Sequence, residues 1–304
     1  MKKNVLITGG SGFIGKYLTA MLLEKGYSVS ILSREKKENT TTVSYYTWDV
    51  TNQKIEEAAV LQADYIIHLA GENIADQRWT LKRKATIRAS REESIALLYS
   101  VLKKNGKKLD GFVSASGIGI YGAYNGEGIC TEETAAASDF LGVTCQQWEA
   151  AVAPIANLGI RTVKIRTGLV LGKNEGFLKK MLPVFKYGLG AALGSGQQYM
   201  PWIHIHDLCA MYIAAIENPA MQGAYNAVVA DNTTNTIFSK KLAHVLGFAL
   251  WLPNVPAFIL HLMLGEMAVI VLTGRRVSSD KIRNLGFHFE FKDLEEALED
   301  CLSK

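Results

Sequence analysis

Short apolar segments alternate with amphipathic ones along the first half of the chain. Residues 4–8 are apolar and end at glycines, and residues 13–26 then carry apolar side chains at helical spacing up to Gly26. Strands that alternate with helices are typical of a parallel, doubly wound sheet, so the pattern predicts an α/β fold. Further strands are predicted at 27–33, 43–48, 64–70, 111–116 and 160–168, and helices at about 80–104 and 139–158.

The pattern changes after Gly168. Glycines gather between residues 188 and 196, and helices are predicted near 235–247, 256–273 and 293–302. We therefore expect one domain over 1–168, completed by part of 206–230, where 224–229 is predicted to return as a strand to the first sheet. Residues 169–304 are expected to form a smaller C-terminal substrate lobe.

Composition narrows the class of protein. The chain has 304 residues and a net charge of +4, and it has no long basic run, so we expect no nucleic-acid partner. The four cysteines are not spaced like metal ligands, which predicts reduced thiols and no metal site. The first residues lack the apolar core of a signal peptide, and we expect a cytoplasmic protein.

The most apolar stretch, 256–273, is interrupted by His261 and Glu266 and is shorter than a spanning helix needs, so no membrane partner is expected. If this stretch is buried, it belongs to the core. If it is exposed, it favours a partner protein or a homodimer.

A glycine-rich loop joins the first predicted strand to the first predicted helix. Gly9 would allow a tight turn, Gly12 would let a pyrophosphate approach the backbone, and Gly15 would let the helix pack closely on the strand. Phe13 and Ile14 would open the helix, whose free N–H groups attract phosphate. In this strand–loop–helix context the glycines predict a Rossmann-type dinucleotide site.

The end of the second predicted strand bears on the choice of dinucleotide. Sites for NAD place an Asp or Glu here for the ribose 2′-hydroxyl, whereas this chain has Ser33 and Arg34. A serine hydroxyl and a guanidinium suit a 2′-phosphate, which predicts NADP(H) rather than NAD(H). A solvated basic turn is the alternative.

Four further residues belong to the predicted cofactor site. Asp49 follows the third strand and is expected at the adenine end. Leu69, Ala70 and Gly71 end the fourth strand, where small residues would let a ribose approach. His68, inside this apolar strand, is predicted to be a core histidine.

These motifs, together with Ser114–Ser116, Ile165–Gly172 and Trp202–Asp207, resemble those of the extended short-chain dehydrogenase/reductases. The chain is most similar to the atypical branch labelled epimerase-family proteins, whose substrates are largely unknown. Its narrower markers are Gly71–Ile74, Arg78-Trp79, Ser90-Arg91, Asp139–Leu141, Trp148-Glu149, Gly194–Gly196 and Pro201–His204.

The resemblance implies redox chemistry by a Tyr-x-x-x-Lys pair on the helix at 139–158. Glu149 matches the glutamate that follows this lysine by four residues, which places Cys145 at the lysine position and Leu141 at the tyrosine position. Neither side chain can supply the acid and base of such a pair. Ser116 matches the family's serine, and Tyr121 is the candidate substitute for the proton donor, with a packing role as its alternative.

Some of the remaining candidate residues also have a structural role as an alternative. The resemblance implies that Arg91 holds the cofactor, against a solvated arginine on a helix face. Arg166 would bind a substrate anion or close an internal ion pair, and Trp202 would line the substrate cleft or fill the core. Glu72, Arg78 and His204 are expected to contact the small-molecule substrate.

Two functions remain. The first is an NADP(H)-dependent oxidoreductase or epimerase-like enzyme with a non-standard site. The second is a non-catalytic NADP(H)-binding module that acts through a protein partner.

Overall fold

The computed structural model describes residues 2–173 and 175–303. Its main sheet is built from β1 (Asn4–Thr8), β2 (Ser28–Ser33), β3 (Val43–Asp49), β4 (Lys54–Ile55), β5 (Tyr65–His68), β6 (Gly111–Gly117), β8 (Thr162–Thr167) and β11 (Gly223–Ala227). Within the described residues the order is β11-β8-β6-β5-β1-β2-β3-β4, parallel throughout except for the β3–β4 pair. The strand order reverses between β1 and β5, and ligands bind at such a switch point in doubly wound sheets.

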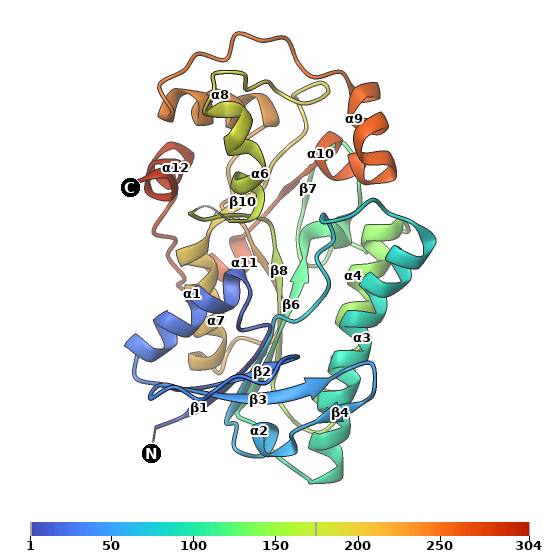
Figure 1. Cartoon of the computed structure of the whole chain (residues 1–304), viewed down its shortest axis with the longest axis vertical. Coiled ribbons are helices and arrows are strands. Elements are labelled where there is room, and N and C mark those ends of the chain that lie inside the picture. The colour runs from blue at the N-terminus through green and yellow to red at the C-terminus, as the bar shows by residue number, and fades with distance from the viewer. Residues whose placement is uncertain (1, 174, 304) are drawn as a thin grey trace.

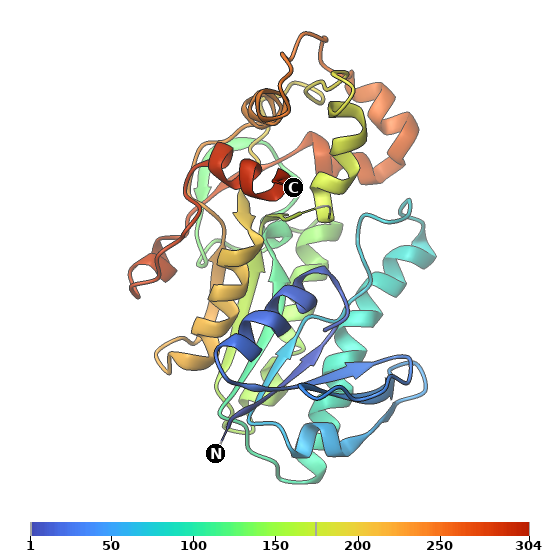
Figure 2. The same cartoon turned by 60° about the vertical axis from the view of Figure 1, so that its left-hand side comes forward.

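Helices cover both faces of this sheet (Figures 1 and 2). Val5 and Ile7 of β1 point into one apolar layer, and Leu6 points into the other, as the alternation of a strand requires. The first layer includes α1 (Phe13–Glu24) and α7 (Ile205–Glu217). The second includes α2 (Glu57–Leu61), α3 (Leu81–Lys104), α4 (Phe140–Ala150) and α5 (Ala153–Ala156).

A smaller lobe lies above the sheet in Figure 1. The ring of Phe13, directly after the phosphate loop, packs against Gly172 and Gly176, so the lobe meets the sheet at this loop. The helices and short strands outside the sheet and its layers are η1 (Ile118–Tyr121), β7 (Gly126–Cys130), β9 (Leu169–Leu171), α6 (Gly176–Phe185), β10 (Trp202–His204), α8 (Asn235–Val245), α9 (Ala257–Leu264), η2 (Gly265–Ala268), α10 (Val269–Leu272), β12 (Arg275–Val277), α11 (Asp280–Arg283) and α12 (Leu294–Leu302).

The strand expected at 224–229 is β11, and it pairs with β8 as the seventh parallel strand of the main sheet. The expectation of one helix over 256–273 was wrong. Gly265, at φ +61, ends α9, and two short helices follow. The sequence also failed to indicate α7, whose mostly apolar character hides helical periodicity because the helix is buried against α1 and the main sheet.

None of the helices in the described ranges combines the length and the apolar character that crossing a bilayer requires.

Candidate dinucleotide-binding site

The phosphate loop is closely packed against the end of β5. Gly9 has φ +72, and a Cβ atom there would lie 3.0 Å from the backbone nitrogen of Ala70. A Cβ at Gly15 would lie 2.5 Å from Cα of Gly10. Gly12 is the N-cap of α1 and offers no side-chain cap, so the N–H groups at the start of α1 have no capping side chain to bind. This is the geometry in which a helix N-terminus accepts a phosphate.

Two arginines and one carboxylate meet beside the end of β2. The Arg34 side chain is 84% exposed, and its Nη1 lies 3.7 Å from Oε1 of Glu72. Arg83, in the first turn of α3, pairs with the other oxygen of Glu72 at 2.8 Å. Ser33 is buried, and its hydroxyl accepts a hydrogen bond from the backbone of Glu35. Glu72 thus lies among the cations of the expected cofactor site.

Hydrogen bonds fix the ends of β3 and β5. Asp49 is exposed and accepts hydrogen bonds from the backbone and the side chain of Asn52, which lower the pKa of its carboxyl. Thr8 ties β1 to β5, because its hydroxyl accepts from the backbone of Ala70 and lies 2.8 Å from Nδ1 of His68. Burial lowers the pKa of His68 to about 3, so the imidazole is neutral in the core.

Arg91 lies beside the end of β5 and is 9% exposed, which rules out the solvated alternative. Its guanidinium donates to the carbonyl of Ile87 and stacks over the ring of Trp148, 4.7 Å from the centroid. A Cβ at Gly71 would lie 3.3 Å from the Arg91 side chain. Because Gly71 has no side chain, the Arg91 side chain lies directly against the backbone of Gly71, where a ribose is expected.

Ser116 and Tyr121 belong to one buried polar network. The hydroxyl of Ser116 donates to Glu149 at 2.7 Å, and Glu149 accepts Nε and Nη2 of Arg166 at 2.7 and 2.9 Å. Nη1 of Arg166 donates to the hydroxyl of Tyr121, which in turn donates to Asn226 at 2.6 Å. These contacts occupy both hydroxyl groups with protein partners.

The network favours structural roles for two candidates. Tyr121 is 2% exposed, and burial raises the pKa of its phenol to about 12. Arg166 closes the internal ion pair that was the alternative to an anion site, and Glu149 raises the pKa of its guanidinium against the effect of burial. A bidentate pair of this kind leaves little of Arg166 for a substrate.

Leu141 and Cys145 lie one helical turn apart on α4, facing the end of β6. A Cβ at Gly119 would lie 3.5 Å from Cβ of Leu141 and 3.6 Å from Sγ of Cys145, and one at Gly117 would lie 3.7 Å from the same sulfur. Burial raises the pKa of the Cys145 thiol to about 12. At neither position can a side chain exchange a proton near neutral pH.

The side chains of Trp202 and Arg78 are hydrogen-bonded to other protein groups. Trp202 is fully buried, and its indole donates to Asp231, so the core alternative accounts for it. The guanidinium of Arg78 donates to the carbonyls of Leu262 and Met263 at the end of α9. Arg78 therefore links the loop after β5 to the small lobe, because its charge suits the carboxyl end of a helix.

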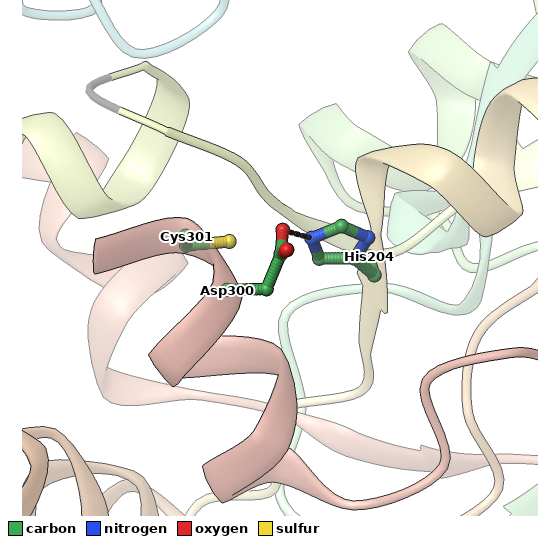
Figure 3. A group of neighbouring side chains, drawn as sticks. All are labelled: His204, Asp300 and Cys301. Carbon is green, nitrogen blue, oxygen red and sulfur yellow. Dashed lines mark ion pairs between the residues drawn. The ribbon is translucent and has the colours of Figure 1, made fainter. Parts of the chain in front are cut away.

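His204, Asp300 and Cys301 come together although they are far apart in sequence (Figure 3). Their ligand atoms lie within 4.8 Å of one another. However, Nδ1 of His204 accepts the backbone N–H of His206, so in the neutral imidazole Nε2 carries the proton. That nitrogen lies 3.2 Å from Asp300, and the arrangement is a contact between β10 and α12 rather than a metal centre.

Two family models match the sequence of this chain. Residues 5–230 match the model of the NAD dependent epimerase/dehydratase family, and residues 255–301 match a domain of unknown function, DUF1731. The chain belongs to the NAD dependent epimerase/dehydratase family.

The similarity to individual relatives extends over nearly the whole chain. It is 35% identical to the epimerase family protein YfhF of Bacillus subtilis, over 99% of this chain and 98% of that protein. The crystal structure of human epimerase family protein SDR39U1 with NADPH is 31% identical, covers 98% of both chains and superimposes with a TM-score of 0.88. UDP-glucose 4-epimerase of Thermotoga maritima, at 18% identity and a TM-score of 0.77 over 98% and 97% of the chains, shares the fold.

Sequence reasoning missed some partners within this family site. Arg83 was overlooked, although Thr80 caps α3 and thereby places Arg83 in the first turn, facing back to Glu72. Asn226 was also missed, because its contact with Tyr121 joins residues 105 positions apart. The first partner could have been found from the Thr80 capping signal, whereas no local pattern indicates the second.

Proposed function

We propose that this chain binds NADP(H) at the switch point between β1 and β5 and acts as an oxidoreductase or epimerase-like enzyme with a non-standard active site. The observation that carries the proposal is the end of β2, where Ser33 and an exposed Arg34 stand in place of a carboxylate. The NADPH in the crystal structure of the human relative supports it. We take the phosphate loop, Ser33, Arg34, Asp49, the segment 69–71 and Arg91 as the cofactor-binding residues.

A Gly15→Ala substitution tests the loop. The added Cβ would meet the backbone of Gly10 and Gly9 at 2.5 Å, so the loop must move away from its phosphate-binding shape. We expect NADPH affinity to fall by at least about tenfold, as for the loss of one charge-assisted hydrogen bond. Isothermal titration calorimetry measures the affinity. Gly128→Ala is the control, because its Cβ would have no neighbour closer than 3.7 Å. Equal affinities would contradict the assignment.

The second candidate function is a cofactor-binding module without redox turnover. The buried network favours it, because the hydroxyls of Ser116 and Tyr121 already have protein partners. Single-turnover mixing of the protein with NADPH and a panel of carbonyl compounds separates the two functions. Oxidation of the bound NADPH supports the enzyme, whereas tight binding without oxidation, together with a partner whose affinity depends on the redox state of the cofactor, supports the module.

Tyr121→Phe tests the remaining proton-donor candidate. Loss of the hydroxyl leaves the side-chain oxygen of the buried Asn226 without its donor and removes one of the two acceptors of Arg166 Nη1, so we expect a free energy of unfolding lower by about 1–3 kcal/mol. NADPH affinity should be unchanged. Urea denaturation and calorimetry check both. If turnover is lost while stability stays at the level of the unsubstituted protein, Tyr121 is the proton donor and the structural assignment is wrong.

A further inference from the structure

Exposed apolar side chains gather on one end of the small lobe. Val184 lies near the end of α6, Tyr187 and Leu189 follow it, and Phe248 and Trp251 lie in the loop between α8 and α9. We call this set the cap face. Trp251 is 68% exposed and Tyr187 80%. Isolated exposed apolar residues are ordinary, but a gathering of this kind marks an interaction site.

Four members of the cap face lie around Gly188. The Trp251 indole donates to the carbonyl of Gly188, and a Cβ at Gly188 would lie 2.9 Å from the ring of Phe248. Gly188 stands between Tyr187 and Leu189, so these four side chains surround one point of the backbone. In Figure 1 the loop that carries Trp251 runs over the top of the molecule between α8 and α9. The face is therefore at an outer end, away from the main sheet.

The part of the small lobe that carries the cap face has an excess of positive charge. The segments 176–206 and 232–265, which build this part of the lobe, contain five lysines and no aspartate or glutamate. Because the whole chain has a net charge of +4 and these segments carry +5, the remainder carries −1. Lys241 is turned to α12 and pairs with Asp293, and Lys180 lies 3.9 Å from Asp76.

The other three lysines are Lys179, Lys186 and Lys240. All three are exposed and form no ion pair within the part of the chain that the structure describes. Lys186 directly precedes Tyr187, so the cap face is bordered by a cation that has no acidic partner among the described residues.

We propose that the cap face binds the surface of a membrane that contains anionic lipids. Tryptophan and tyrosine prefer the interface between lipid and water, and nearby lysines are attracted to anionic headgroups. A second copy of the chain fits less well, because a symmetric contact would bring the same unpaired lysines together. This binding is peripheral, so it agrees with the lack of a spanning helix in the described residues, and it revises the expectation of no membrane partner.

Flotation with unilamellar vesicles tests the proposal. At about 0.1 M salt, where the Debye length is ~10 Å, we expect the full chain to float with vesicles of phosphatidylcholine containing ~30% phosphatidylglycerol and to stay behind with pure phosphatidylcholine. The double variant Lys186→Glu/Lys240→Glu should bind at least about 25-fold more weakly, at roughly fivefold for each lysine near an anionic surface. The matched control is Lys54→Glu/Lys103→Glu, which changes exposed lysines of the main domain.

Tryptophan fluorescence gives a second readout. Trp48, Trp148 and Trp202 are buried and Trp79 is half-buried, so a blue shift on vesicle binding should come from Trp251 and vanish in Trp251→Ser. Circular dichroism checks that this variant folds. Tyr124→Ser, which removes an exposed aromatic residue outside the cap face, should keep the shift.

Two outcomes would overturn the proposal. One is a failure to bind anionic vesicles, or equal binding to both vesicle types. The other is concentration-dependent self-association or capture of a soluble protein that Trp251→Ser abolishes, without vesicle binding, which would assign the cap face to that occupant instead.

Discussion

Replacing Arg34 with glutamate should reverse the preference of this protein for NADPH over NADH. The guanidinium is 84% exposed at the end of β2, free to close on a 2′-phosphate. A charge-assisted hydrogen bond contributes roughly 1.5–3 kcal/mol, so its loss and the added carboxylate should weaken NADPH binding by about 10- to 100-fold or more. NADH should bind at least as well as before, because a carboxylate can accept the ribose 2′-hydroxyl.

Titration of both dinucleotides, followed by tryptophan fluorescence, measures the two affinities. Arg283→Glu is the matched control, because this exposed arginine lies on α11, outside the proposed cofactor site. Glu72→Gln adds a test from the opposite direction. It removes the carboxylate that faces Arg34 at 3.7 Å, so NADPH affinity should rise. An unchanged ratio of NADPH to NADH affinity in Arg34→Glu would show that Arg34 does not read the 2′-phosphate.

Replacing Glu149 with alanine should cause the largest loss of stability among the site variants. Glu149 accepts two nitrogens of Arg166 and the hydroxyl of Ser116, and both charged side chains are at most 10% exposed. Removing one partner leaves the other charge buried, which costs about 3–5 kcal/mol. In a chain of this size we expect Tm to fall by roughly 5–15 °C in a calorimetric scan.

Glu57→Ala provides the comparison, since its pair with Lys104 is at the surface and should contribute no more than about 1 kcal/mol. The double variant Glu149→Leu/Arg166→Met should regain much of the loss, because it leaves no unpaired charge. If Glu149→Ala lowers Tm no more than Glu57→Ala does, the buried network does not stabilise the fold, and Ser116 and Tyr121 are freer for chemistry than proposed.

The sequence by itself determined the architecture and predicted a cofactor site at the phosphate loop. Strand and helix periodicity predicted the parallel sheet, and the spacing of Gly9, Gly12 and Gly15 between a strand and a helix predicted the phosphate loop. These features are local, because each depends on side chains within one or two turns of the backbone. The same holds for Arg34, which is recognised by its place after a strand.

Only the tertiary structure decided which polar side chains are already bound to other protein groups. Ser116, Tyr121 and Arg166 were candidates, yet their partners come from η1, β8, β11 and α4 and are separated by up to 105 residues. A sequence pattern does not encode such pairings, since they depend on how the elements cross in space. The cap face has the same origin, because the contact of Trp251 with Gly188 joins residues 63 positions apart.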